Sequence, residues 1–313
     1  MMVRHLVLIL VCAWTALLAC PAEAASAYAG ERLALGADAR ALALGSAYVA
    51  LAQDATAGYW NAAGLASLEG RQLHLTHDER FGLVDGDFIA MALPGPWGNR
   101  MAVSLLRVGV DDIPFTALQN PELPLGPDNR PVIESQESSA DYALYVSGGR
   151  RLHGRVDLGA SLKLLYSQVG PFNAYGFGAD VGLRLRLGRG LSLAASFRDL
   201  TTTPLFWSTD ATDRIQPSLI AGMAWSVPIA GGRATAAIAS RTGGDAADES
   251  GAAPLNAGVE YWYRNIALRA GMEEEQKAFG LGLQPHRRLA LDAAYLEHDG
   301  LDPTYRFSAG FRF

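Results

Sequence analysis

The last nine residues, Tyr305 to Phe313, alternate strictly between two kinds of side chain. The odd positions carry tyrosine, phenylalanine or alanine, whereas the even positions carry arginine, serine or glycine. Because successive side chains of a β-strand point to opposite faces, this pattern predicts a strand with one apolar face and one small or charged face. The same alternation recurs in 156–167 and 175–188, and it dominates the chain from residue 71 onward.

The length of these segments and the chemistry of their second face favour a membrane barrel over a soluble sandwich. They run for about 10 to 14 residues, which is longer than the usual strand of about 5 to 6 and long enough to cross a bilayer at a tilt. A closed barrel satisfies every backbone N–H and C=O group without an open edge. The charged residues in otherwise apolar strands are therefore candidate lumen-lining residues: Asp157, Lys163, Asp180, Arg184, Arg186, Arg269, Asp292, Arg306 and Arg312.

The spacing of turn residues divides the rest of the chain into about fourteen candidate strands. We place them at 71–77, 86–93, 100–109, 139–149, 155–168, 174–187, 191–199, 215–227, 233–240, 255–263, 266–273, 277–284, 289–297 and 304–313. Their connections alternate between short turns and mostly longer loops, the longest being 110–138. Short periplasmic turns and long outer loops are typical of outer-membrane barrels. The sequence predicts an all-β fold, a closed antiparallel transmembrane β-barrel of about 14 strands in the bacterial outer membrane.

The N-terminus has the pattern of a secretory signal peptide, which we assign to residues 1–27. Arg4 and His5 precede an apolar stretch, and small residues follow it. The stretch that ends at Cys20 also resembles a lipobox, so lipoprotein processing is an alternative. Both cysteines, Cys12 and Cys20, lie in this leader, and after ordinary cleavage no disulfide or thiol chemistry remains.

Residues 28–70 do not alternate with period two. The larger apolar residues of 39–52 fit a weak helix diluted by alanine and glycine. A segment of about 40 residues ahead of the first strand cannot sit in lipid without satisfying its backbone. We therefore expect 28–70 to lie beneath or inside the barrel as a hatch, and 71–313 to form the barrel.

The segment 36–66, GADARALALGSAYVALAQDATAGYWNAAGLA, resembles the N-terminal signature of the PorV/PorQ family, relatives of FadL-type (OMPP1/FadL/TodX) outer-membrane barrels. The family usually has Met at Leu44, Gly at Ser46 and Pro at Ala62. The resemblance implies a 14-stranded barrel with a lumenal hatch, in which Asp54, Trp60 and Asn61 are positioned to gate the lumen.

The resemblance also implies two alternative functions. FadL-like members carry small hydrophobic compounds through the hatch and a lateral opening between strands, which is our leading hypothesis. PorV-like members instead bind exported protein cargo as components of a secretion or surface-attachment machine. The loop 110–138 is long enough to fold over the mouth or to contact such a partner.

Composition and motifs exclude several other classes of protein. The formal net charge of −6 argues against a nucleic-acid partner. His74 and His77 are three apart and so face opposite sides of a strand, which disfavours a shared metal. We find no nucleophile–base pair that predicts an enzyme and no motif that predicts a cofactor.

The C-terminal residues predict how the chain reaches its membrane. The alternating aromatics Tyr305, Phe307 and Phe311 and the terminal Phe313 resemble the signal that barrel-assembly machinery reads. We expect this machinery, outer-membrane lipid and lipopolysaccharide as partners, together with either a hydrophobic ligand or an exported cargo protein.

Overall fold

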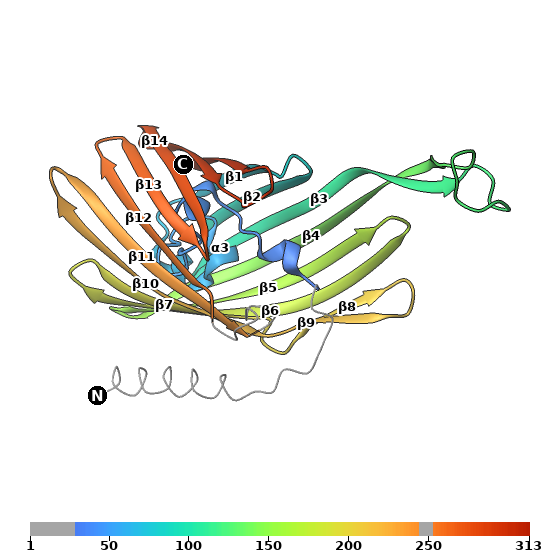
Figure 1. Ribbon diagram of the computed structural model, residues 1–313. Coiled ribbons are helices and arrows are strands. Elements are labelled where there is room, and N and C mark those ends of the chain that lie inside the picture. Colours follow the sequence, from blue (N-terminus) through green and yellow to red (C-terminus); the bar gives the residue numbers. More distant parts are fainter. Residues whose placement is uncertain (1–28, 244–252) are drawn as a thin grey trace.

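The computed structural model describes residues 29–243 and 253–313. The predicted signal peptide and both cysteines lie outside the described residues. No helix of the described residues is long and apolar enough to span a membrane. The described chain consists of a large antiparallel sheet preceded by a helical segment (Figure 1).

The sheet contains sixteen strands within the described residues. Their bounds are β1 Gln72–Arg80, β2 Val84–Pro94, β3 Arg100–Leu118, β4 Pro131–His153, β5 Val156–Val169, β6 Phe172–Gly188, β7 Leu191–Arg198, β8 Thr203–Trp207, β9 Thr212–Ile215, β10 Ser218–Ile229, β11 Gly232–Gly243, β12 Leu255–Tyr263, β13 Ile266–Glu273, β14 Gln276–His286, β15 Leu289–Leu296 and β16 Thr304–Arg312.

Fourteen of these strands form a closed barrel, which confirms the predicted fold class. Each strand pairs with its neighbour in the chain, β7 pairs with β10, and β1 pairs with β16 from Gln72↔Arg312 to Arg80↔Thr304. The remaining two strands, β8 and β9, form a hairpin that pairs with β6 at residues 174–176. The sequence pattern did not separate this hairpin from the expected loop 200–214.

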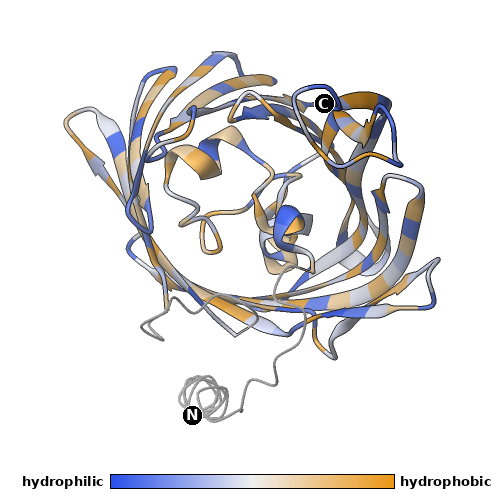
Figure 2. Cartoon of the chain, turned by 45° about the vertical axis from the view of Figure 1, so that its right-hand side comes forward, coloured by the Kyte–Doolittle hydropathy of each residue, from blue (hydrophilic) through white to orange (hydrophobic). Residues whose placement is uncertain are grey.

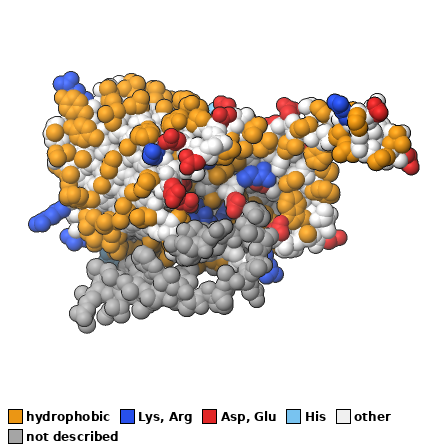
Figure 3. Space-filling view, in the orientation of Figure 1, with side chains coloured by type: hydrophobic (Ala, Val, Ile, Leu, Met, Phe, Trp, Pro, Cys, Tyr) orange, Lys and Arg blue, Asp and Glu red, His pale blue; other side chains and the backbone are white. Residues whose placement is uncertain are grey.

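Side chains alternate across the wall as the period-two pattern predicts. In β16, the outward-facing Tyr305 and Phe307 are 46% and 57% exposed, whereas Arg306, between them, is 0% exposed. Hydrophobic side chains cover much of the barrel wall in the space-filling view (Figure 3). An apolar outer surface and a polar inner face are the arrangement expected of a barrel in lipid.

The two ends of the barrel differ as predicted. We call the end with the short connections the turn end; it comprises 69–71, 94–100, 150–155, 186–190, 229–233, 263–266, 284–288 and 312–313. A 3-10 helix, η3 (Pro96–Gly98), lies in its first turn. The opposite end, with the longer connections, is the loop end. β1 begins and β16 finishes at the turn end.

The expected long loop 110–138 is largely a β-hairpin, so its description as a loop was wrong. β3 continues to Leu118 and β4 begins at Pro131, and the two strands stay paired across this whole length. The hairpin projects away from the barrel rather than folding over its mouth (Figure 1). Register shifts between Val110 and Ile113 and between Phe115 and Thr116 accompany its departure from the wall.

Outward-facing tyrosines form short rows near the loop end. Tyr142, Tyr166 and Tyr175 are neighbours in register, with ring centroids 5.9 and 5.1 Å apart. Tyr295 and Tyr305 form a second pair at 5.6 Å. Such rows are typical of the aromatic girdles at a membrane interface.

Residues 29–70, which we call the lumenal segment, lie inside the ring of strands (Figure 2). The segment contains η1 (Glu31–Ala34), α2 (Ala39–Ala43), α3 (Ala57–Trp60) and η2 (Ala62–Ser67). Between residues 36 and 65, Gln53 alone is exposed. Abundant alanine and glycine suit this position, because small side chains let a folded segment fit within a narrow barrel.

Candidate functional site

The lumenal segment contacts the wall through a strip of glycines on β4, β5 and β6. Gly149, Gly159 and Gly182 are direct neighbours in register. A Cβ atom at Gly149 would lie 2.5 Å from the carbonyl oxygen of Ala62, and one at Gly159 would overlap the Ala62 carbonyl carbon. The strip is therefore a groove in the wall into which the backbone of the lumenal segment fits. A side chain at any of these glycines would exclude that backbone.

A second strip receives the other half of the segment. Gly258 of β12 and Gly271 of β13 are paired in register, and a Cβ at either would overlap the backbone of Leu44 or Gly45. At Gly280 of β14, an added Cβ would overlap the Cβ of Ala43. The segment is thus held between two separate glycine strips of the barrel wall.

Asn61, a predicted gate residue, fixes the turn that enters the first strip. Its Oδ1 accepts a hydrogen bond from the Ala63 N–H at 3.1 Å and thereby caps η2. Its Nδ2 donates to the carbonyl oxygen of Val49 at 3.2 Å and lies 3.3 Å from that of Leu183 in β6. Asn61 is 2% exposed, so the whole amide is used inside the protein.

Trp60, the second predicted gate residue, lies in an aromatic cluster. Its ring packs edge-on against Tyr48 at 5.7 Å and Tyr59 at 5.1 Å between centroids. Tyr59 in turn meets Phe88 of β2 at 6.2 Å and Tyr145 of β4 at 5.8 Å. This cluster places an aromatic contact between the segment and the wall; the Trp60 indole N–H is buried without a hydrogen-bond partner.

Asp54, the third predicted gate residue, braces the segment rather than the wall. Its carboxylate accepts hydrogen bonds from the Tyr48 hydroxyl at 3.1 Å and from the Thr56 hydroxyl at 2.6 Å. Burial and the nearby Asp54 charge raise the pKa of Tyr48 well above its usual value. The Tyr48 phenol therefore keeps the proton that it donates.

A charged network ties the segment to β12, β13 and β15. Arg40 forms an ion pair with Glu260 at 2.7 Å, and Glu260 is also bonded by Arg269 at 2.7 Å. Arg269 then reaches Asp292 at 2.7 Å. Each charge thus has an opposite neighbour, as buried charges require.

A second connection joins the segment to the seam between β1 and β16. Asp38 faces His74 at 3.3 Å, and Arg306 pairs with Asp78 at 3.1 Å while donating to the carbonyl oxygen of Leu35 at 2.9 Å. Burial opposes ionisation of Asp38, but the hydrogen bond and charge of His74 outweigh it and lower the pKa of the Asp38 carboxyl. His77, three residues on, points outward to Asp87, as the spacing predicts.

The other predicted lumen-lining residues form two further groups. Lys163 bridges Asp180 at 2.9 Å and Asp199 at 2.7 Å, where Asp199 belongs to the turn between β7 and β8. Asp157 is fully buried and pairs with Arg151 and Arg186, and Arg184 donates to Ser67 at 3.2 Å. Arg312 shares their face of its strand but is exposed at the turn end, where the lumen finishes.

Sequence reasoning missed several residues that hold the lumenal segment. Glu260 lies on the same face of its strand as Asn256 and Gly258, so the period-two pattern contained the signal. Asp38 and Arg40 carried no such signal, because the segment has no strand periodicity. Within 29–243 and 253–313 we find no group of three or more His, Cys, Asp or Glu side chains suited to a metal ion.

Two cavities border the segment within the described residues. They lie near Arg32 and near Lys163 and have volumes of about 160 and 40 Å³. A groove of about 960 Å³ lies instead on the outer wall, lined by outward residues such as Leu75, Ile89 and Phe307. That groove faces lipid, so its size gives no measure of the lumen.

Known proteins resemble this chain in structure but not in sequence. No family model matches the sequence, and no curated protein matches it significantly. Among solved structures, the Pseudomonas putida toluene transporter TodX has a TM-score of 0.53 at 15% identity, covering 86% of this chain and 96% of that chain. A TodX mutant described as a monoaromatic hydrocarbon channel gives 0.53 at 14%, covering 82% and 94%.

A Pseudomonas aeruginosa FadL homologue has a TM-score of 0.52 at 11% identity, covering 88% of this chain and 98% of that chain. These likenesses support the relation to FadL-type barrels and give no support to the PorV/PorQ assignment. The two TodX structures are described as a hydrocarbon channel and a toluene transporter. The chain thus has the fold of FadL- and TodX-type channels and is a β-barrel of the bacterial outer membrane.

Proposed function

We propose that this barrel passes small hydrophobic compounds across the outer membrane and that the lumenal segment acts as its hatch. The observation that carries the proposal is the seating of the segment. It lies inside the ring of strands, yet it rests on the wall through two glycine strips and polar bonds rather than by strand pairing. A segment held in this way can move without unzipping the barrel.

The aromatic cluster supports a hydrophobic cargo. Tyr59 of the segment meets Phe88 and Tyr145 of the wall edge-on, with Trp60 packed against Tyr59, so a shift of the segment opens a contact lined by aromatic rings. Aromatic and apolar surfaces with few polar groups suit small apolar ligands. The structural likeness to a toluene transporter agrees with this class of compound.

The predicted site residues then take defined roles. Trp60 supports Tyr59, which makes the aromatic contact with the wall, Asn61 holds the turn in its glycine strip, and Asp54 keeps Tyr48 in place beside Trp60. The inward charges hold the hatch in the closed state. Arg269 does so indirectly, through its ion pair with Glu260, and Arg306 does so directly, by donating to the Leu35 carbonyl of the hatch.

A disulfide that locks the hatch to the wall tests the proposal. A Cβ at Gly58 would lie 3.6 Å from the Cβ of Ala102 in β3, within the usual disulfide range of about 3.5–4.5 Å. The Ser147 hydroxyl, 2.8 Å from the same position, must rotate aside. We expect the G58C/A102C protein in liposomes to pass toluene when reduced and to block it when oxidised.

Each single-cysteine variant, treated with the same oxidant, is the control and should conduct toluene in both states. A hydrophilic sugar of similar size measures leakage and should cross equally slowly in all samples. Equal toluene flux through the oxidised and reduced double variant would contradict hatch gating. Negligible toluene flux in every sample would contradict the transport function itself.

The projecting β3–β4 hairpin favours a second candidate, a PorV-like receptor for exported protein cargo. Its tip is organised by Asn129, whose Nδ2 donates to the carbonyl oxygens of Asn120, Leu123 and Pro124. Phe115, Leu123, Leu125 and Ile133 expose apolar surface along it. Trimming residues 111–138 should abolish co-purification of exported proteins if this is the function, and should leave toluene flux intact if it is not.

A further inference from the structure

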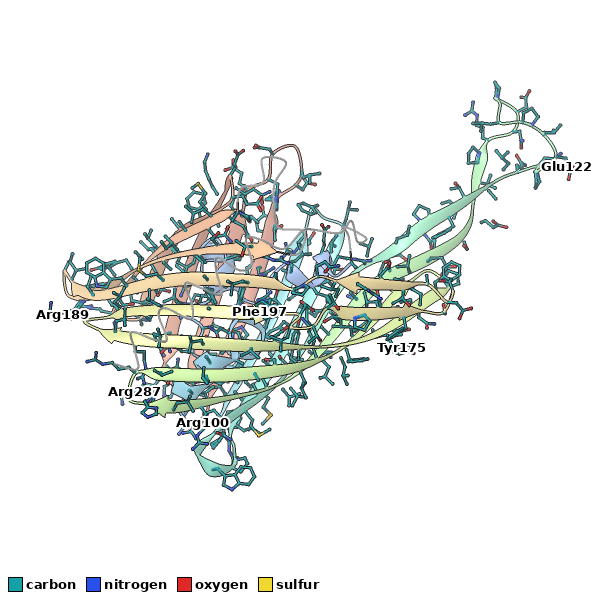
Figure 4. The ribbon with its side chains drawn as sticks, turned by 90° about the horizontal axis from the view of Figure 1, so that it is seen from below. Arg100, Glu122, Tyr175, Arg189, Phe197 and Arg287 are labelled. Carbon is teal, nitrogen blue, oxygen red and sulfur yellow. The ribbon has the colours of Figure 1, made fainter. Side chains whose placement is uncertain are left out.

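Arginine is concentrated at the turn end of the barrel. Each of the six turns, and also the seam between β16 and β1, carries at least one. The arginines concerned, which we call the arginine ring, are Arg71, Arg100, Arg150, Arg151, Arg155, Arg186, Arg189, Arg233, Arg264, Arg287, Arg288 and Arg312. Figure 4 shows Arg100, Arg189 and Arg287 together at this end, opposite Glu122 at the tip of the β3–β4 hairpin.

Negative charge is distributed in the opposite way. The turn end, as defined by its residues, contains one acidic side chain, the exposed Glu69. Asp157, nearby, is fully buried and already paired. The described loop end is acidic, with Glu79, Asp85, Asp111, Asp112, Glu122, Asp128, Glu134, Glu137, Asp210, Asp213, Glu273, Glu274, Glu275, Glu297, Asp299 and Asp302. The protein is therefore polarised along the axis of its barrel.

Most of the arginine ring is exposed and without an acidic partner. Arg100 and Arg186 are half-buried, and the other ten are exposed. Of those ten, Arg151 pairs with Asp157 at 2.9 Å. Within the described residues, no carboxylate lies within ion-pair distance of the other nine. These exposed cations around the rim are therefore free to bind an anionic partner outside the protein.

Aromatic side chains accompany the arginine ring. Trp97, in the first turn, is 85% exposed, and Trp225, Tyr263 and Phe313 also face outward at this end. The Trp225 indole donates to the carbonyl oxygen of Arg189 at 3.2 Å, which joins an aromatic residue directly to the ring. Exposed aromatics beside cations are typical of the interface between lipid chains and headgroups.

We propose that the arginine ring binds the phosphate groups of anionic glycerophospholipids in the periplasmic leaflet. The shape of the ring favours this partner, because a leaflet surrounds the barrel whereas a folded protein would meet one side. Its composition agrees, since every cation in these ranges other than histidine is arginine, whose planar fork fits a phosphate in two places. The inference stands whether or not the barrel transports hydrophobic compounds.

The charge polarity also selects the leaflet. Lipid A phosphates belong to the outer leaflet, at the loop end, where the exposed acidic side chains of this protein oppose them. Phospholipid phosphates of the inner leaflet lie at the turn end. The arginine ring therefore distinguishes the two sides of an asymmetric membrane.

A pair of charge-matched variants tests the proposal in the purified full-length protein. Arg287→Gln/Arg288→Gln removes two exposed charges of the ring, and Arg130→Gln/Arg214→Gln removes two exposed charges at the loop end. Native mass spectrometry would count bound phosphatidylglycerol across a titration, with phosphatidylcholine and lipid A in parallel. We expect the turn-end variant to weaken phosphatidylglycerol binding at that turn by about 25-fold, about fivefold for each charge.

The loop-end variant should bind phosphatidylglycerol as the unmodified protein does, and phosphatidylcholine binding should be equal in all three. Rising salt should release phosphatidylglycerol from the unmodified protein, which gives a readout that needs no folded variant. Arg287→Lys/Arg288→Lys should restore part of the affinity for phosphatidylglycerol, because lysine restores the positive charge but not the planar guanidinium group. Equal phosphatidylglycerol binding by both glutamine variants, salt-independent binding, or preference for lipid A would each overturn the proposal.

Discussion

The packing of the lumenal segment against the wall depends on the absence of a side chain at Gly159. Its position on β5 is filled by the Ala62 backbone, so even a methyl group has no room. The alternation of the strand placed this glycine on the inner face. What it faces was hidden from the sequence, because the contact joins residues almost a hundred positions apart and one partner lies outside any strand.

Gly159→Val should displace η2 from the wall. Overpacking of a close contact costs about 1–3 kcal/mol, and the Ala62 backbone cannot move aside as a flexible side chain would. We expect a cysteine introduced at Ala63 to react with a thiol reagent much faster in this variant. The temperature at which the barrel unfolds in SDS gel electrophoresis should fall.

Gly154→Ala is the matched control, because nothing lies within 4 Å of a Cβ at that turn position. It should leave both thiol reactivity and barrel stability unchanged. Unaltered labelling of position 63 in Gly159→Val would mean that the glycine strip does not seat the segment.

Among the predicted site residues, Asn61 uses its amide to bind backbone groups. Trp60 packs its ring against Tyr48 and Tyr59 of its own segment. Whether either residue gates a solute stays a prediction. The partners Glu260 and Asp38 were missed because a charge is recognisable in a sequence, whereas its counter-charge in another element is not.

The β3–β4 hairpin is the element that the sequence described least well. Its prolines are compatible with strands, because Pro131 begins a strand and Pro114 follows a register shift, two positions that β-structure tolerates. Pro121, Pro124 and Pro127 are confined to the tip. The barrel strands themselves were predictable, because lipid on one side and polar packing on the other enforce strict alternation.

Asn129→Ala should loosen the hairpin tip and nothing else. The substitution removes an NH₂ group whose two hydrogens are shared among three backbone carbonyls, and the hydrogen bond that Asn129 Oδ1 accepts from the Asn120 N–H at 2.9 Å. Orphaned polar groups cost about 1–3 kcal/mol each when buried. We expect limited proteolysis to cut within 119–130 at a markedly higher rate.

The same variant should keep the unfolding temperature of the barrel, since the tip lies away from the wall. Asp128→Ala, the exposed neighbour, is the control and should be cut no faster than the unmodified protein. Resistance of the Asn129→Ala tip to protease would show that other contacts order it.

At the scale of the whole molecule, Phe313 extends the pairing that closes the barrel. The Phe313 N–H donates to the Arg71 carbonyl at 3.0 Å, and the Arg71 N–H donates back at 3.1 Å. These two bonds continue the β1–β16 ladder beyond Gln72↔Arg312. The sequence marked Phe313 as an assembly signal, a role that stays a prediction, and the structure adds its place in the seam.

Deleting Phe313 should reduce the amount of heat-modifiable barrel recovered from outer membranes. The loss combines a missing aromatic signal with two missing backbone bonds at the edge of the seam. Phe313→Trp keeps both bonds and an aromatic ring, so it should assemble nearly normally. Equal yields from the deletion and the unmodified protein would contradict the assembly role.

The contacts of the lumenal segment with the seam bear on the entropy cost of closing the barrel. The Ala39 N–H donates to the Ser308 hydroxyl of β16 at 2.9 Å, and the Thr76 hydroxyl of β1 donates to the carbonyl oxygen of Ala37 at 3.2 Å. β1 and β16 are the most distant strands in the chain, so their pairing has the largest loop-closure entropy to overcome. A segment that touches both strands therefore stabilises their pairing from inside the barrel, where it offsets part of that entropy cost.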